Sequence, residues 1–225
     1  MSAPLIVAID GPSGAGKSTA ARALAVRLAV PYIDTGAMYR AVGLAARDRG
    51  IALPIEDAEA VASIARRARI ELIPDAAGNR VHLDGRDVSE EIRRPEISLY
   101  ASAVSAIPAV RRSLVAEQQR LGRERGGVME GRDIGTRVFP ETPFKFFLTA
   151  DPGVRAERRA AELSARGTPQ PLEAVRREME QRDRDDGSRA DSPLTLDDRY
   201  VLIDSTGRPL EAVVAEIERR VRETI

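Results

Sequence analysis

The residues best suited to chemistry in this chain lie near its start, between Asp10 and Thr19. This stretch reads DGPSGAGKST and fits G-x-x-x-x-G-K-[ST] at every constrained position. Glycines let a backbone curl so that successive N–H groups point inward, toward phosphate oxygens. The lysine of this pattern supplies charge for the β- and γ-phosphates, and the next hydroxyl can ligate Mg²⁺. We therefore expect phosphate binding by Gly11, Pro12, Ser13, Gly14, Ala15, Gly16, Lys17, Ser18 and Thr19, with Ser18 as the metal ligand.

The flanking segments suit such a site. The apolar run 5–9 predicts a buried parallel strand, and the alanine-rich segment 19–28, with Leu24 and Leu28 four residues apart, predicts a helix. A glycine-rich turn that merely caps an ordinary helix is the alternative, and the full motif match disfavours it. The chain has only two lysines, Lys17 and Lys145, so a lysine at this position suggests that arginine would not serve.

Composition limits the remaining possibilities. The chain has 225 residues, a formal net charge of zero and no cysteine. These values predict one α/β domain without disulfides or thiolate metal sites, and with no general attraction to nucleic acid or anionic membranes. No signal-like segment precedes Asp10, and no apolar run approaches the roughly 20 residues of a membrane span. We expect a cytoplasmic monomer.

Past the first helix, the chain predicts a strand at 32–34, a helix from Thr35 to about Arg49, and another helix over 56–68. Thr35 stands where a helix start favours a hydroxyl. Short β-like runs at 70–73, 80–83 and 86–88, separated by turns at 77–79 and 84–85, predict a small antiparallel insert over about 70–92. His82, the one histidine, lies on such a run, and we expect a structural or exposed role for it.

The second half of the chain continues the alternation of strands and helices. Prolines at 95, 108, 152 and 209 suit helix starts, and strands are predicted at 128–130, 144–149 and 200–203. In the last helix, apolar residues recur at the helical period and predict a core-facing stripe: Leu210, Val213, Val214, Ile217 and Val221. Five core strands alternating with helices predict a doubly wound parallel sheet with helices on both faces.

Arginines are concentrated in the predicted helix that starts at Pro152 and in the next one, at about 172–184, with a loop at 167–171 between them. Such a pair could close over a polyphosphate as a lid. Interleaved glutamates support the alternative of salt-bridged surface helices.

The motif indicates a nucleoside triphosphate without saying how it is used. A GTPase would read guanine with N-K-x-D, but the only asparagine is Asn79, outside such a motif. An ATPase motor would carry an extended Walker B signature, which is missing. A small kinase needs a second anion site and a lid, and this chain has arginines for both.

Several segments in order resemble the bacterial cytidylate kinase family, of the nucleoside monophosphate kinase group. They are Ile9–Thr19, DTGAMYR at 34–40, GRDIGT at 131–136, RDRDDGSR at 182–189, DST at 204–206, and the β insert. The resemblance covers nearly the whole chain. It implies a core from 1–35, 95–150 and 195–225, a monophosphate-binding region at about 36–94, and a lid at about 153–190.

The resemblance also implies roles for single residues. Arg40, Arg132 and Arg189 would hold the acceptor monophosphate. Ser102, Arg111 and Asp133 would read the base with Thr35 nearby, and Arg182 and Asp186 would hold the ribose and phosphate end. Arg155, Arg158 and Arg159 would belong to the lid over ATP. The implied catalytic group is Lys17, Arg132, Asp133 and Arg189.

The implied reaction is transfer of the γ-phosphoryl group of ATP to CMP or dCMP with Mg²⁺. The sequence departs from the family's pattern at Thr35, where serine is expected, and at Glu130, where aspartate is common. Another small kinase acting on UMP, AMP or an alcohol, or a nucleotide-dependent regulatory module, remains an alternative.

Overall fold

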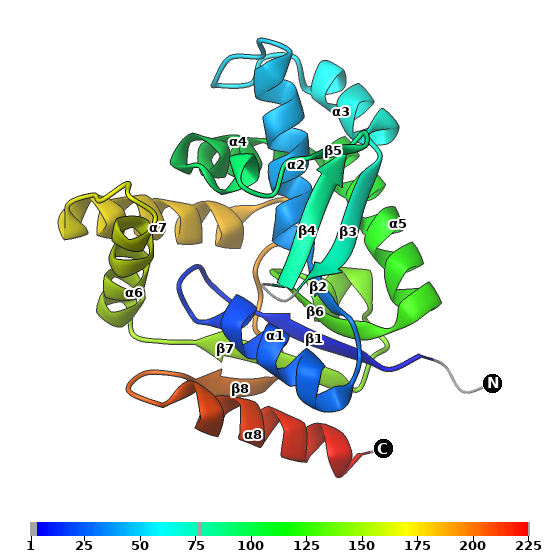
Figure 1. The fold of residues 1–225 in the computed structure, drawn as a ribbon, viewed down its shortest axis with the longest axis vertical. Helices are drawn as coiled ribbons and strands as arrows, with labels where there is room; N and C mark the ends of the chain where they lie inside the picture. The colour runs from blue at the N-terminus through cyan, green and yellow to red at the C-terminus, as the bar shows by residue number, and fades with distance from the viewer. Residues whose placement is uncertain (1–3, 76–77, 225) are drawn as a thin grey trace. The chain divides into compact units, whose positions relative to one another are not determined.

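The computed structural model describes residues 4–75 and 78–224. Figure 1 labels the elements. The strands are β1 (Ile6–Asp10), β2 (Tyr32–Asp34), β3 (Ile70–Asp75), β4 (Gly78–Leu83), β5 (Arg86–Asp87), β6 (Gly127–Gly131), β7 (Phe144–Thr149) and β8 (Val201–Asp204). The helices are α1 (Lys17–Leu28), α2 (Thr35–Asp48), α3 (Ala58–Arg67), α4 (Pro95–Ser105), α5 (Pro108–Arg125), α6 (Pro152–Ala165), α7 (Leu172–Ser188) and α8 (Leu210–Arg222). A 3₁₀ turn, η1 (Glu91–Arg93), and a π turn, η2 (Ile134–Val138), complete the order.

Five strands form one parallel sheet in the order β2-β6-β1-β7-β8, which confirms the predicted fold class. β1 is central, and Ile9 pairs with Phe146 of β7. Every residue of β1 is buried, as is typical of a strand covered on both faces. The strand order reverses beside β1, and ligands of such sheets bind beyond the carboxyl ends of the strands at this point.

The predicted insert is a three-stranded antiparallel sheet, β3-β4-β5. The turn predicted at 77–79 is wrong for Asn79, which lies in β4 opposite Pro74, while Ala77 lies outside the described residues. Asn79 is buried, donates to the carbonyl of Tyr32 at 3.1 Å and accepts from the Asp34 N–H at 3.3 Å. Asn79 therefore does not form a turn but makes two hydrogen bonds to β2.

Asp34, and not Thr35, caps the start of α2. The Asp34 carboxylate accepts from the Ala37 N–H at 2.9 Å, while Thr35 is the first helical residue and is buried. A carboxylate at this position satisfies one of the helix N–H groups that have no partner within the helix.

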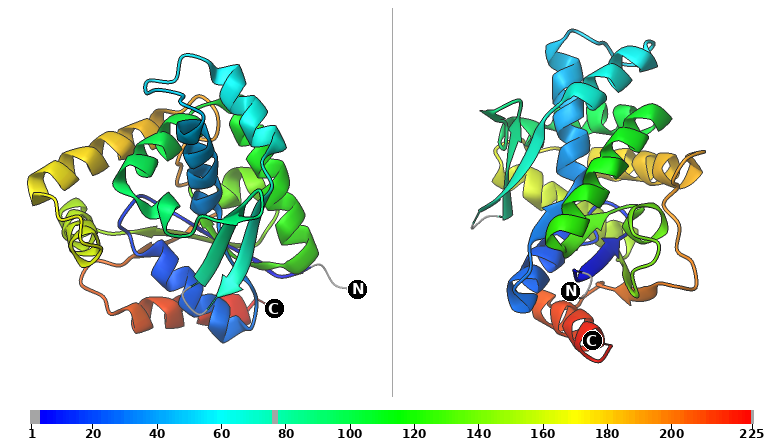
Figure 2. Two further views of the ribbon diagram at one scale, coloured as in Figure 1. Left: turned by 45° about the horizontal axis from the view of Figure 1, so that its top comes forward. Right: turned by 90° about the vertical axis from the view of Figure 1, so that its right-hand side faces the viewer.

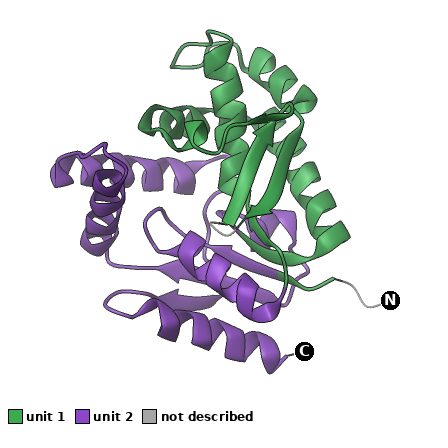
Figure 3. Cartoon of the chain, viewed as in Figure 1, with its two compact units in different colours: residues 1–6, 30–129 green, residues 7–29, 130–225 purple. Residues whose placement is uncertain are grey.

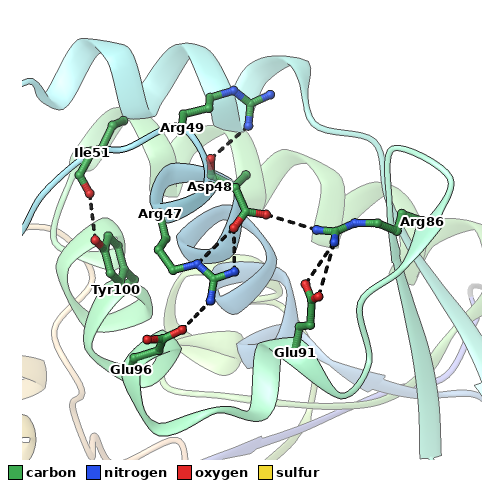
Figure 4. A network of polar contacts seen from close by, with 9 residues as sticks. Arg47, Asp48, Arg49, Ile51, Arg86, Glu91, Glu96 and Tyr100 are labelled. Carbon is green, nitrogen blue, oxygen red and sulfur yellow. Dashed lines mark hydrogen bonds and ion pairs between the residues drawn. The ribbon is translucent and has the colours of Figure 1, made fainter.

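The other end of α2 carries a network of charged residues, shown in Figure 4. Asp48 accepts from Arg47 at 2.6 Å and from Arg86 of β5 at 3.1 Å. Arg86 also pairs with Glu91 at 3.2 Å, and Arg47 pairs with Glu96 of α4. Exposed ion pairs contribute little individually, so the network chiefly orients the small sheet and α4 around the end of α2.

The chain divides into two compact units, coloured in Figure 3. One comprises residues 1–6 and 30–129, and the other 7–29 and 130–225. The first holds the three-stranded sheet and α2–α5, while the second holds the glycine-rich loop, α1 and α6–α8. Among the described residues, no helix is long and apolar enough to cross a membrane.

Helices α6 and α7 form a hairpin in the second unit, which the left view of Figure 2 shows. They pack through a small apolar core of Ala156, Leu163, Val175 and Met179. α7 runs four residues beyond its predicted end, to Ser188.

In α8, four of the five residues of the predicted stripe are buried. Leu210 is the exception at 43% exposure, because it is the first residue of the helix.

Two helical glycines give a matched test of packing. A Cβ on Gly43 of α2 would lie 3.0 Å from the Ala101 nitrogen of α4, whereas one on Gly187 of α7 would meet nothing within 4 Å. Gly43→Ala should lower the free energy of unfolding by about 1–3 kcal/mol through overpacking. Gly187→Ala should leave it unchanged or raise it by up to about 1 kcal/mol, because alanine is the better helix former. Urea denaturation measures both, and equal effects would contradict this packing.

Candidate functional site

The glycine-rich loop turns sharply between β1 and α1. Gly11 follows β1 with φ 144°, and a Cβ there would lie 2.0 Å from the carbonyl oxygen of Leu148 on β7. Gly16 is the N-cap of α1 in a left-handed conformation, and no side-chain hydrogen bond caps the start of this helix. The first turn of α1 contains no acidic residue. The helix N-terminus therefore presents its N–H groups and positive dipole end to an anion.

Lys17 lies within this loop, and its side chain is almost fully buried. Its Nζ donates to the carbonyl of Pro12 at 2.7 Å. Burial, followed by the nearby charges of Arg132 and Arg182, lowers the pKa of Lys17 to about 7, against the opposing effect of Glu130 and Asp10. A polyanion would stabilise the charged amine, as a phosphate-binding lysine requires.

Ser18, the expected metal ligand, is exposed at the start of α1. The described residues contain no cluster of three His, Cys, Asp or Glu side chains suited to a metal. Mg²⁺ commonly takes one or two protein oxygens and completes its shell with water and substrate phosphates. A single accessible hydroxyl beside the loop fits that pattern.

Asp186 of α7 brings two predicted acceptor-binding arginines together. Its carboxylate pairs with Arg132 Nε at 2.8 Å and with Arg189. Burial acts to raise the pKa of Asp186, but Arg132, Arg189 and Arg182 together outweigh it and hold that pKa below its ordinary value. The carboxylate therefore stays ionised and keeps cationic groups beside one another, which is the requirement for binding a phosphate dianion.

Asp10, the last residue of β1, organises the segment that follows β6. Its two carboxylate oxygens accept from the N–H groups of Ile134 at 2.9 Å and Gly135 at 2.8 Å, and from the Tyr200 hydroxyl at 2.7 Å. The two amides open the π turn η2, directly after Asp133. Asp10 thus fixes the loop that carries Arg132 and Asp133. Burial raises the pKa of Asp10 to about 6, although all three hydrogen bonds lower it.

The three predicted lid arginines have different surroundings. Arg155 is buried, Arg158 donates to Ser205, and Arg159 pairs with Glu162 at 2.9 Å. Other arginines of these helices form surface pairs of the kind expected for salt-bridged helices, such as Arg176 with Glu180 at 3.0 Å. The hairpin thus carries the surface ion pairs that the sequence suggested, and its role as a lid stays a prediction.

The remaining predicted substrate residues lie in the first unit. Arg40 is partly exposed, with its guanidinium 3.6 Å from the Asp34 carboxylate. Arg111 of α5 is buried, lies 5.4 Å from the centre of the Tyr39 ring and donates to the Ser105 carbonyl at 3.3 Å. Ser102 accepts through its own carbonyl from the Ser105 hydroxyl at 2.8 Å.

Within the second unit, the structure brings together Lys17, Arg132, Arg182, Asp186 and Arg189. Asp10 and Ser205 lie in segments that the sequence singled out, but neither of them, nor Tyr200, had a role of its own predicted from the sequence. His82 lies on β4 with Nε2 4.0 Å from the Asp87 carboxylate, in the first unit.

The buried carboxylate of Asp10 predicts a pH effect on stability. Its folded pKa exceeds the unfolded value of 3.8, so between these values the folded state binds more protons and the contribution of Asp10 to stability falls as pH rises. Between about pH 4.5 and pH 7, the free energy of unfolding of the wild type should therefore fall by about 2 kcal/mol relative to that of Asp10→Asn. Urea denaturation across that range measures the difference, and a constant difference would count against a buried, raised pKa.

Comparisons with known proteins show the family of this chain. A family model for cytidylate kinase matches residues 7–223. The chain is 48% identical over 217 residues to a cytidylate kinase of Caldanaerobacter subterraneus subsp. tengcongensis, covering 96% of this chain and 94% of that protein. It is 46% identical over 203 residues to a bifunctional pantoate ligase/cytidylate kinase of a Synechococcus species, covering 89% of this chain but 37% of that longer protein.

A solved structure shares the fold at low sequence identity. It is an uncharacterized protein from Eubacterium ventriosum ATCC 27560, with a TM-score of 0.54 and 12% identity over 97% of this chain and 98% of that one. This likeness concerns architecture alone. Because the family model spans nearly the whole sequence and a relative of similar length shares almost half of its residues, the chain belongs to the cytidylate kinase family.

Proposed function

We propose that this chain transfers the γ-phosphoryl group of ATP to CMP, and also to dCMP, yielding ADP and the corresponding diphosphate. Family membership supports the acceptor, and the glycine-rich loop supports the donor. The observation that carries the proposal is the buried cationic group around Asp186 in the same unit as Lys17. Two polyanions repel each other, so an enzyme joining them needs positive charge at both phosphates.

In this proposal, Lys17 and the N–H groups of the loop bind the ATP phosphates, while Arg40, Arg132 and Arg189 bind the phosphate of CMP. Transfer is direct and in line, with no covalent enzyme intermediate. Mg²⁺, when bound, neutralises the charge of the ATP phosphates, and the Ser18 hydroxyl holds it. Residues 153–190 act as a lid that excludes water, so ATP hydrolysis without CMP is slow.

Base selection is assigned to Ser102, Arg111 and Asp133, with Thr35 near the base. Cytosine has an amine donor next to the acceptors N3 and O2. A carboxylate can accept from that amine, and a guanidinium can donate to the acceptors. Uracil has a carbonyl in place of the amine, so Asp133 would lose its bond. Asp186 and Arg182 are assigned to the ribose and phosphate end, and Asp186 has lone pairs beyond those used by its two arginines.

A coupled assay of ATP against CMP, dCMP, UMP and AMP tests this function. Rapid turnover with CMP and dCMP, and little ADP formed without an acceptor, is the expected outcome. Equal ATP turnover with and without CMP would contradict the proposal that residues 153–190 act as a lid. Preference for another monophosphate would indicate a different small kinase, and ATP binding without any product would indicate a regulatory module. Sedimentation would test the expectation that the protein is a monomer.

Removing the Asp133 carboxylate should weaken base selection more than donor binding. Asp133→Ala should lower the ratio of kcat/KM for CMP over UMP by about tenfold to a hundredfold, since an unmatched buried polar group costs about 1–3 kcal/mol. The Kd for ATP should be unchanged. Asp185→Ala is the matched control, because that aspartate is exposed and its carboxylate accepts from the Gln181 side chain at 2.7 Å. An unaltered CMP:UMP ratio in Asp133→Ala would refute the assignment.

A further inference from the structure

Carbonyl oxygens of the glycine-rich loop are held by side chains from distant parts of the chain. The Ser13 carbonyl accepts from Arg155 of α6 at 3.1 Å. The Ala15 carbonyl accepts from the hydroxyl of Ser205, just after β8, at 3.1 Å. All of these groups belong to the second unit.

These contacts determine the direction of the neighbouring amides. A trans peptide is planar, so its carbonyl and the N–H of the next residue point in opposite directions. The hydrogen bond to the Ser13 carbonyl therefore directs the Gly14 N–H away from Arg155. The hydrogen bond to the Ala15 carbonyl likewise directs the Gly16 N–H away from the Ser205 hydroxyl. Glycine accepts many backbone conformations, so peptides next to Gly14 and Gly16 would otherwise rotate easily.

The guanidinium of Arg155 is buried and already has several partners within the protein. Arg155 is 8% exposed, and its Nε donates to the Ala150 carbonyl at 3.1 Å. The nitrogen that binds Ser13 also pairs with Asp183 of α7 at 2.6 Å. The backbone of Arg155 touches the loop too, because a Cβ on Gly14 would lie 2.8 Å from its carbonyl oxygen.

Ser205 is 5% exposed, and its hydroxyl is oriented by a second arginine. Arg158 donates to the Ser205 hydroxyl oxygen and to its carbonyl, both at 2.9 Å. Because Arg158 occupies the oxygen as an acceptor, the hydroxyl hydrogen is available for the Ala15 carbonyl.

We propose that Arg155 and Ser205 are positioning residues of the phosphate loop, holding the Gly14 and Gly16 amides toward the bound nucleotide. This rests on the proposed nucleotide site, and it gives Arg155 a role different from a lid residue that touches ATP directly. The two roles predict different effects on the binding of ADP and ATP. Loop amides bind the α- and β-phosphates, which ADP and ATP share. A lid arginine on the γ-phosphate would affect ATP alone.

Calorimetric titration of ADP and ATP, each with Mg²⁺, distinguishes the two roles. Ser205→Ala should raise the Kd of both nucleotides by about threefold to tenfold. Arg155→Met should raise both Kd values by about tenfold or more. The KM for CMP in Ser205→Ala should be unchanged, whereas a general loss of folding would alter both substrates.

Matched controls remove similar groups elsewhere. Ser113→Ala deletes a hydroxyl that donates to the Ala109 carbonyl at 3.1 Å in α5, and Arg176→Met deletes an exposed arginine of α7. Both should bind ADP and ATP as the wild type does.

Wild-type binding by Ser205→Ala, or loss of ATP but not ADP affinity in Arg155→Met, would overturn the proposal. If Arg155→Met fails to fold, the milder Ser205→Ala decides. A wild type that binds both nucleotides but does not phosphorylate CMP would refute the proposed activity while leaving this inference testable.

Discussion

Positive charge concentrated among buried residues is the constraint that the site has to accommodate. Lys17 is almost fully buried and interacts unfavourably with Arg132 and Arg182. Asp186 limits the cost by pairing with Arg132 and Arg189, and Glu130 favours the charged form of Lys17. Carboxylates thus hold the cations in place, while the start of α1 adds dipolar attraction and no opposing charge. An incoming polyphosphate meets groups that are already positioned, so little reorganisation accompanies binding.

Local patterns were enough to predict much of the fold. The strands at Tyr32–Asp34 and Phe144–Thr149 and the helix at Pro108–Arg125 have the predicted bounds. Each has a clear signal in its own residues, either an apolar run or a proline at the helix start. The fold class followed from the alternation of such elements. The loop from Gly11 to Ser18 was predicted in the same way, because its pattern is continuous in sequence.

Contacts between residues far apart in sequence could not be predicted. Asp10 and Tyr200 are separated by 190 positions, and nothing near either one indicates the other. The first two amides of the π turn after Asp133 donate to Asp10, a partner that lies 124 and 125 positions away from them in the sequence. The cap of α2 was misassigned for a different reason. Asp34 and Thr35 are both good caps, and only the backbone decides which one precedes the helix.

Gly11 shows how a motif residue can be required for reasons unrelated to its ligand. The atom that excludes a side chain there belongs to Leu148, on the strand paired with β1. The sheet itself therefore demands glycine at this position, whether or not a phosphate ever binds. A descendant of this protein that had lost its activity would still keep Gly11 in order to fold. Among sequences of this type, that glycine therefore reports an intact sheet and gives no information on whether the enzyme still works.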